Sequence, residues 1–302
     1  MEININKELE LTEKFKKNIP EDLLKPTDLN LLILDTLFDY IVIFLSILLY
    51  LNSTLILKII LIIIIVSRLH SFGVILHELT HLPMKKKNYK IIILECLVGY
   101  PVGSTLNAMR YHHLRHHKDN GMHNDPYFHH FENYEKNHIL IKMINIFIGF
   151  ILIPSWILRS LIGGWCLLNK NLQIIYAKLF FEHKGELKPS DLDEIRECCK
   201  EDIKQASYLI IMFLIIFKIA GLNLIFQLYF IPILITGIVS YYRLMKEHDY
   251  TRVYDRKLST VINITNDHNI NNPLSFLLAP RNIGYHVAHH LHPQVGYRNL
   301  KK

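Results

Sequence analysis

Long apolar stretches alternate with shorter polar ones along most of the chain. The first apolar stretch runs from Leu31 to about Val66 and is broken only by the uncharged, turn-prone tetrad Leu51-Asn-Ser-Thr54. A second stretch, 206–242, is broken near Gly221-Leu-Asn223. A helix needs about 20 residues to cross a bilayer. We therefore predict two transmembrane hairpins, which together give four spans.

Three other segments have different patterns. Residues 91–109 are apolar but interrupted by two glycines and a proline, which indicates a short or re-entrant segment. Residues 139–168 are apolar with scattered cations, and we expect helices that lie at the membrane interface or dip into it. Residues 182–205 are strongly charged and predict a surface helix on the cytoplasmic side.

Three charged residues accompany the first hairpin. Asp35 and Asp39 lie at its entrance, and Lys58 lies just past its turn. Long charged side chains near helix ends commonly reach back to the interface. We expect all three residues to do so.

The balance of charges indicates an orientation in the membrane. Net charge is +7, and most lysines and arginines fall on the side of the hairpins that also holds both termini. Basic loops face the cytoplasm in multi-pass proteins. The expected fold is therefore an all-α integral membrane protein with a cytoplasmic helical cap, in one domain over 1–302. Residues 1–30 would form a polar cytoplasmic arm, and no cleaved signal peptide is expected.

Composition also restricts the possible partners. Half of the residues are hydrophobic, and no Lys/Arg tract is interleaved with aromatic residues, so we expect a membrane partner and no nucleic acid. The four cysteines form no C-x-x-C motif and no disulfide framework, which favours reduced thiols.

Candidate chemistry lies in three histidine motifs at membrane boundaries. The first is H-x-x-x-H, and the other two are H-x-x-H-H. Histidines at positions i, i+3 and i+4 share one face of a helix, and imidazole is a ligand for iron, zinc, copper and nickel. His112 is an alternative to His113 in the second motif. The eight candidate ligands are His77, His81, His113, His116, His117, His286, His289 and His290.

Eight histidines exceed what one ion can use, because four to six ligands saturate most metal ions. The count therefore favours two metals, and an all-imidazole dinuclear site for redox chemistry points to iron. The first motif alone also matches H-E-x-x-H, in which Glu78 would be the general base of an intramembrane zinc protease. The other histidines are expected to be surface or hydrogen-bonded residues, and His292 is ambiguous.

With its three motifs in this order, the chain resembles the membrane fatty acid desaturases of the histidine-box desaturase/hydroxylase superfamily. Further similarity lies in Asp125-Pro126 after the second box, in Asn282-Ile-Gly-Tyr-His286, and in His290-Leu-His-Pro293. Glu247-His248 resembles a Glu-His pair that precedes the third box in relatives. The resemblance implies that His248 is a ninth ligand.

The resemblance implies an enzyme that holds two Fe ions, uses O2 as co-substrate and introduces a double bond into a fatty acyl chain of a lipid or acyl thioester. No His-Pro-Gly-Gly haem motif is present, so electrons would come from a separate ferredoxin or cytochrome. The chain departs from the family pattern at Gly284, where proline is usual, and at Ala288, where many relatives have glutamate.

Several alternatives remain at this point. A lipid hydroxylase or a carotenoid hydroxylase/ketolase would share the same ligands and differ in pocket shape. The zinc protease is more distant, and a metal transporter or store would place its ligands inside the spans. Arg110, Arg115 and Arg281, near the boxes, would either anchor the protein at the membrane or meet an anionic headgroup.

Overall fold

In a computed structural model, the described residues are 10, 19–25, 27–83, 87–128, 139–250, 262 and 264–302. These residues form helices and no named strand, and one isolated β-bridge joins His248 and Thr265. The expected all-α fold is confirmed. Most of the polar arm expected over 1–30 lies outside the described residues.

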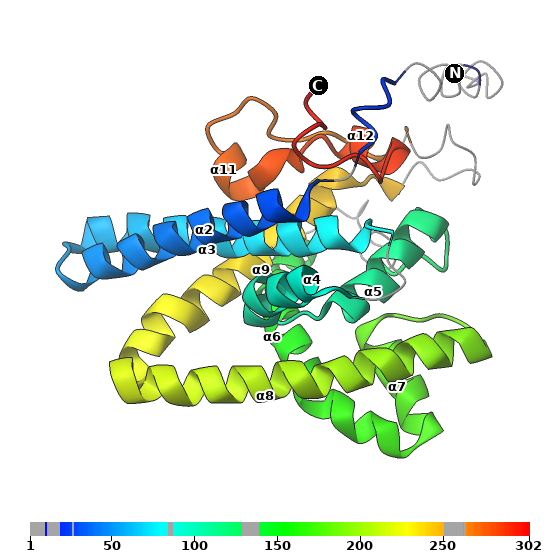
Figure 1. Cartoon of the computed structure of the whole chain (residues 1–302), viewed down its shortest axis with the longest axis horizontal. Coiled ribbons are helices and arrows are strands. Elements are labelled where there is room, and N and C mark those ends of the chain that lie inside the picture. Colours follow the sequence, from blue (N-terminus) through cyan, green and yellow to red (C-terminus); the bar gives the residue numbers. More distant parts are fainter. Residues whose placement is uncertain are drawn as a thin grey trace.

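The first expected hairpin is present. Helix α2 (Leu29–Leu51) is capped by the Asp28 side chain, which accepts from the Asn30 backbone N–H. Helix α3 (Leu55–Thr80) begins after a short turn and packs along α2, as Figure 1 shows. Helix α3 continues without a break past the end of its apolar stretch. Its last turn therefore places His77 beyond the helix pair, in the histidine cluster.

The second hairpin differs from the expectation in one respect. The charged surface helix and the first arm of the hairpin belong to one helix, α8 (Pro189–Ile225), which runs without a break as far as Gly221. The chain turns at Gly221, whose φ of 74° is favoured only for glycine. It continues through the π-helical turn η5 (Phe226–Phe230) into α9 (Ile231–Glu247), and Figure 1 shows the reversal in yellow.

Residues 91–109 form a bent segment. Helix α4 (Tyr89–Leu94), the π-helical turn η1 (Glu95–Gly99) and the 3-10 turn η2 (Tyr100–Val102) lead into α5 (Leu106–Asp119). The two halves meet at 78°, which fits either a broken span or a re-entrant loop. Helix α5 carries the second histidine motif.

Residues 139–163 form one long helix, α6 (Ile139–Gly163), in place of several short ones. It continues into the 3-10 turn η4 (Gly164–Leu168) and is followed by α7 (Lys170–Phe180). Four stretches of the described chain are long and apolar enough to cross a membrane, or five if the bent segment is counted as a further span. These stretches are Leu29–Leu51, Leu55–Thr80, Met143–Leu168 and the 59-residue Pro189–Glu247, which contains both arms of the second hairpin. The number of spans therefore stays a prediction.

Asp35 and Asp39 are buried in ion pairs and do not extend toward solvent, so the expectation for these two residues was wrong. Asp39 is completely buried and pairs with Arg68 at 2.9 Å and with Arg281 at 2.8 Å. Asp35 pairs with Arg281 at 2.9 Å and with Arg298 at 2.6 Å. A carboxylate among apolar helices needs such partners, because an unpaired buried charge is very costly. Lys58 lies 5.0 Å from the Tyr50 ring, in a cation–π contact.

The C-terminal part of the chain completes the histidine cluster. Helix α11 (Ser275–Leu278) packs on α3 and α9, and the 3-10 turn η7 (Pro280–Asn282) leads toward α12 (His286–Leu291). Arg281 lies in η7, so its ion pairs with α2 fix the turn that precedes the third histidine motif. Figure 1 shows α11 and α12, in orange and red, above the α2–α3 pair.

Candidate metal centre

All nine candidate histidines meet at one end of the helices. Their ring nitrogens form two groups, and within each group the candidate ligand atoms lie within 4.8 Å of one another. The first group has five members and the second has four. The first group is His77, His81, His113, His117 and His289, and the second is His116, His248, His286 and His290.

The distances in the first group suit ligands of a single ion. The Nε2 atom of His113 lies 3.0 Å from Nε2 of His81 and 2.9 Å from Nε2 of His117. The Nε2 atoms of His117 and His289 are 3.1 Å apart. Two imidazoles bound to one metal at about 2.1 Å and at right angles would have their nitrogens about 3.0 Å apart.

The second group has similar spacing. The Nε2 atoms of His116 and His290 are 3.3 Å apart, and those of His248 and His286 are 3.2 Å apart. All four residues are buried. Burial lowers the pKa of His286 and His290 well below the usual value, so these rings stay neutral and can act as ligands.

Each H-x-x-H-H motif is divided between the two groups. His113 and His117, at i and i+4, belong to the first group, whereas His116 belongs to the second. In the third motif, His286 and His290 belong to the second group and His289 to the first. The i and i+4 side chains are stacked one above the other on the helix, while the i+3 side chain is offset around it. Each of these short motifs therefore contributes side chains to both groups.

Asp125 orients one ligand. Its carboxylate lies 3.0 Å from Nδ1 of His116, and it also accepts from the backbone N–H groups of Gly121 and Tyr127. The Tyr250 hydroxyl donates to the same carboxylate at 2.6 Å. Burial alone would raise the pKa of Asp125, but His116 and these donors hold it below its usual value. The resulting carboxylate fixes the His116 ring so that Nε2 faces the second group.

Glu247 lies beside the third motif, where it pairs with His268 and Arg243 but stays beyond hydrogen-bond distance of His286. Its Oε1 atom lies 3.1 Å from Nε2 of His268, 3.0 Å from Nε of Arg243 and 3.7 Å from Nδ1 of His286. Sequence reasoning singled out Asp125 and Glu247 only by resemblance and missed Tyr250. A lone tyrosine in a polar segment carries no local signal of such a contact.

Glu78 is directed away from the histidines. Its carboxylate accepts from the Thr27 hydroxyl at 2.8 Å and from the Tyr297 backbone N–H at 3.3 Å. A protease general base would have to face a metal-bound water. This contact pattern counts against the zinc-protease alternative.

The remaining sequence candidates lie outside both groups. His112 is buried against the rings of Tyr127 and Trp156, so His113 is the member of the second motif that joins a group. His292 is buried and also belongs to neither group. His70, His183 and His268 form hydrogen bonds, as expected, whereas His129, His130 and His138 lie outside the described residues.

The three arginines near the boxes make internal contacts. Arg110 donates to the carbonyl oxygens of Thr80 and Leu82, and Arg115 donates to that of Phe181. Arg281 forms the ion pairs with α2. These contacts tie the helices that carry the boxes to their neighbours.

The two departures from the family pattern have different surroundings. A Cβ atom at Gly284 would overlap the His268 carbonyl oxygen, so no larger residue fits there without a shift of the backbone. Ala288 packs against the main apolar core. Asp125 and Glu247 lie beside the candidate ligands on other elements.

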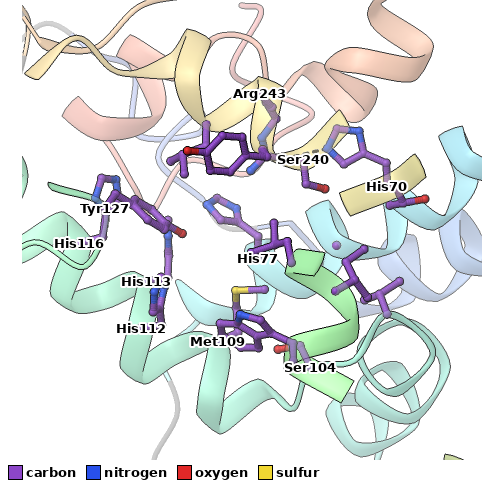
Figure 2. Close-up of a pocket in the computed structure, with 18 of the residues that line it drawn as sticks. His70, His77, Ser104, Met109, His112, His113, His116, Tyr127, Ser240 and Arg243 are labelled. Atoms are coloured by element: carbon purple, nitrogen blue, oxygen red, sulfur yellow. Dashed lines mark hydrogen bonds between the residues drawn. The ribbon is translucent and has the colours of Figure 1, made fainter. Parts of the chain in front are cut away.

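A cavity of about 190 Å³ adjoins both groups. Helices α3, α5, α6 and α9 line it, together with residues of the histidine cluster. Figure 2 shows His77, His113 and His116 around it. Its apolar wall is formed by Leu69, Val102, Met109, Leu152, Ile153 and Trp156.

The donor set fits a pair of metal ions. Nine imidazoles crowd their nitrogens at about 3 Å, and this arrangement gains little unless a cation lies between them. Neutral imidazole nitrogens in groups of four and five suit the metals that imidazole binds, which are iron, zinc, copper and nickel.

Comparison with known proteins gives an independent result. A sequence model of the family described as "Fatty acid desaturase" matches residues 53–302. This range includes all nine histidines of the two groups. No match to a curated protein was found. The chain belongs to the fatty acid desaturase family.

Proposed function

We propose that this oxidoreductase is a diiron, O2-dependent desaturase that introduces a double bond into the acyl chain of a lipid or acyl thioester. The observation that carries the proposal is the division of nine histidines into two adjacent groups beside a cavity among apolar helices. When bound, two irons would supply the oxidising chemistry. The balanced reaction takes one O2, two electrons and two protons, removes two hydrogens from the chain and gives two waters.

Residues of this chain would hold the ions and the substrate. The five histidines of the first group would bind one iron and the four of the second would bind the other. Asp125 orients the ring of His116. The apolar wall of the cavity would hold the methylene groups and exclude water from them.

The partner and the orientation follow from the same reasoning. Two electrons per turnover require a separate electron-transfer protein, a ferredoxin or a cytochrome. Both termini and the histidine boxes would face the cytoplasm, where basic segments are favoured and such donors are found.

Metal analysis of the purified protein tests the metal assignment. We expect about two irons per chain, because there are two ligand groups. A single zinc per chain would contradict the proposal and restore the protease alternative. Under that alternative, His77→Ala should remove the metal, because His77 would be a ligand, whereas Glu78→Gln should leave the metal in place.

Lipid analysis of cells that express the protein separates desaturation from hydroxylation. A product that has lost two hydrogens supports the desaturase. A product that has gained one oxygen supports the hydroxylase, which would use the same metal ligands, one O2 and two electrons but release one water. A ketolase would carry out two such oxidations at one carbon, and its product would also have lost two hydrogens.

A further inference from the structure

One wall of the cavity beside the histidines carries polar side chains from α9, at and just beyond the end of its apolar stretch. Thr236, Ser240, Arg243 and Glu247 follow each other at intervals of four, three and four residues, so they lie on one face of α9. All four line the cavity. In Figure 2, Arg243, Ser240 and His70 lie on the side opposite Met109 and Ser104. A purely hydrocarbon ligand gives no reason for such a wall.

The charged residues Arg243 and Glu247 lie at a different level of the cavity from the apolar residues of α6. Gly237 of α9 crosses α6 at Gly149 and Ile153, so the apolar lining from α6 lies near the start of this face. Arg243 is six residues further along α9, which is about 9 Å at the helical rise per residue. The cavity therefore has an apolar end beside α6 and a polar end at Arg243.

Arg243 has donors to offer to a ligand. Its Nε atom lies 3.0 Å from Glu247, and Nη1 lies 3.4 Å from Nε2 of His70. A guanidinium has five N–H donors, more than these two contacts use. Glu247 is also shared with His268, so its negative charge is divided between two partners.

The charge of the site also favours a negative or electron-rich group. The nine histidines are neutral as ligands, so two divalent ions would keep most of their positive charge. Arg243 lines the same cavity as His77, His116 and His286 and adds to that charge. Among the described residues, the carboxylates of Glu182 and Glu247 line the cavity, and Asp125 lies behind His116; together they offset only part of this charge. An oxygen acceptor placed at Arg243 would reduce this repulsion.

We propose that Arg243 binds the carboxyl-derived oxygen of the acyl substrate, as a carboxylate or as a thioester or ester carbonyl. The alkyl chain would then extend toward the α6 end of the cavity. This inference rests on the proposed function and adds to it the direction of binding. Because the second histidine group adjoins the polar end, oxidation would occur within a few carbons of the carboxyl group.

Ligand binding to the iron-loaded protein without a reductant tests the proposal. The probes are octanoate, methyl octanoate and octane, measured with wild type, Arg243→Met and Arg243→Lys. We expect Arg243→Met to weaken octanoate binding about tenfold or more, which is the effect of losing one charged hydrogen bond, and to leave octane binding unchanged. Arg243→Lys should restore part of the octanoate affinity.

A matched control is Arg298→Met, which removes an arginine with one carboxylate partner away from the cavity. It should bind all three probes as wild type does. Methyl octanoate distinguishes the two sources of the oxygen. A loss for octanoate alone assigns a free acid, and a loss for both assigns a carbonyl that an ester or thioester also provides.

Equal affinities of Arg243→Met and wild type for octanoate would overturn the proposal, as would an equal loss for octane. Iron content, measured on the same samples, keeps the two proposals apart. Protein that lacks iron contradicts the diiron function whatever the probes do, whereas iron-loaded protein with an unchanged octanoate affinity contradicts only the role of Arg243.

Discussion

At the scale of single residues, the sequence identified every histidine that the structure brings into the two groups. The sequence could not show which histidine belongs to which group, because the division depends on how α5 and α12 face each other. Spacing within one helix shows that His113, His116 and His117 share a face, but not that His116 turns to a different set of partners.

This division gives a first prediction. His116→Ala removes one of the four ligands of the second group, so the iron content should fall from about two per chain toward one. Elemental analysis of the purified variant measures this. His112→Ala is the matched control, since His112 is a buried histidine on the same helix outside both groups. An equal loss of iron in the control would contradict the assignment.

A second prediction concerns the carboxylate behind His116. Asp125→Asn weakens the contact that fixes the ring, and loss of such a partner typically lowers metal affinity about 10- to 100-fold. Competition with a chelator, followed by iron analysis, measures the change. The exposed Asp193→Asn should behave as wild type. Unchanged chelator resistance in Asp125→Asn would show that the ring is held by its other neighbours.

At the scale of helices, close crossings position the site. Helices α6 and α9 meet at two glycines, and a Cβ atom on Gly149 would lie 2.9 Å from the Ile238 Cα. A Cβ atom on Gly237 would overlap the Gly149 carbonyl oxygen. Side chains larger than hydrogen would force these helices apart. Because α9 ends one residue before His248, its position determines that of a ligand.

Gly237→Ala should therefore destabilise the fold by about 1–3 kcal/mol, as overpacking usually does. Thermal unfolding in detergent provides the measurement. The control is Gly73→Ala on α3, where a Cβ atom meets nothing within 4 Å. That variant should be as stable as wild type or more so, because alanine favours helix over glycine by about 1 kcal/mol. Equal stability of the two variants would argue against a tight α6–α9 crossing.

The ion-pair cluster is the second feature that connects helices. Asp39→Asn leaves Arg68 and Arg281 without their shared carboxylate, and breaking a buried pair costs about 3–5 kcal/mol. We expect a lower unfolding temperature together with a lower iron content, since Arg281 precedes the third histidine motif. Glu197→Gln breaks an exposed pair with Lys200 and should change stability by less than about 1 kcal/mol. An unaffected Asp39→Asn would mean that the cluster adds little.

Local sequence reasoning failed for Asp35 and Asp39 for a physical reason. A carboxylate near the end of an apolar helix has two stable environments, the interface and a buried partner. Apart from Arg68, which pairs with Asp39, the partners are Arg281 and Arg298, which lie more than 240 residues away. Similarly, the apolar pattern located the second hairpin, but it could not show that α8 continues through the charged segment.

At the scale of the whole molecule, the two hairpin turns should lie on the opposite side of the membrane from the histidine cluster. In Figure 1 both turns lie at the left, away from α5 and α12. This arrangement predicts that Asn52, in the first turn, and Lys302, at the C-terminal end of the described chain, are accessible from opposite sides. Both residues are exposed.

Cysteine labelling tests this orientation. Cys96→Ser removes the one native cysteine that is not buried, and Asn52→Cys or Lys302→Cys is then introduced. A membrane-impermeant maleimide applied to intact cells should label Asn52→Cys, whereas inverted vesicles should be required for Lys302→Cys. Labelling of both variants in intact cells would contradict the predicted topology.

The ion pairs between α2 and the C-terminal segment also have a consequence for biosynthesis. The ribosome completes α2, with Asp35 and Asp39, long before it reaches Arg281 and Arg298. Until then, the two acids lack these partners in a nascent hairpin that has already entered the membrane. The third histidine motif emerges between the two arginines. The same late event would pair Asp35, add a second partner to Asp39 and complete both histidine groups, so a chain that stalls before residue 281 would keep an unpaired Asp35 and an incomplete metal centre.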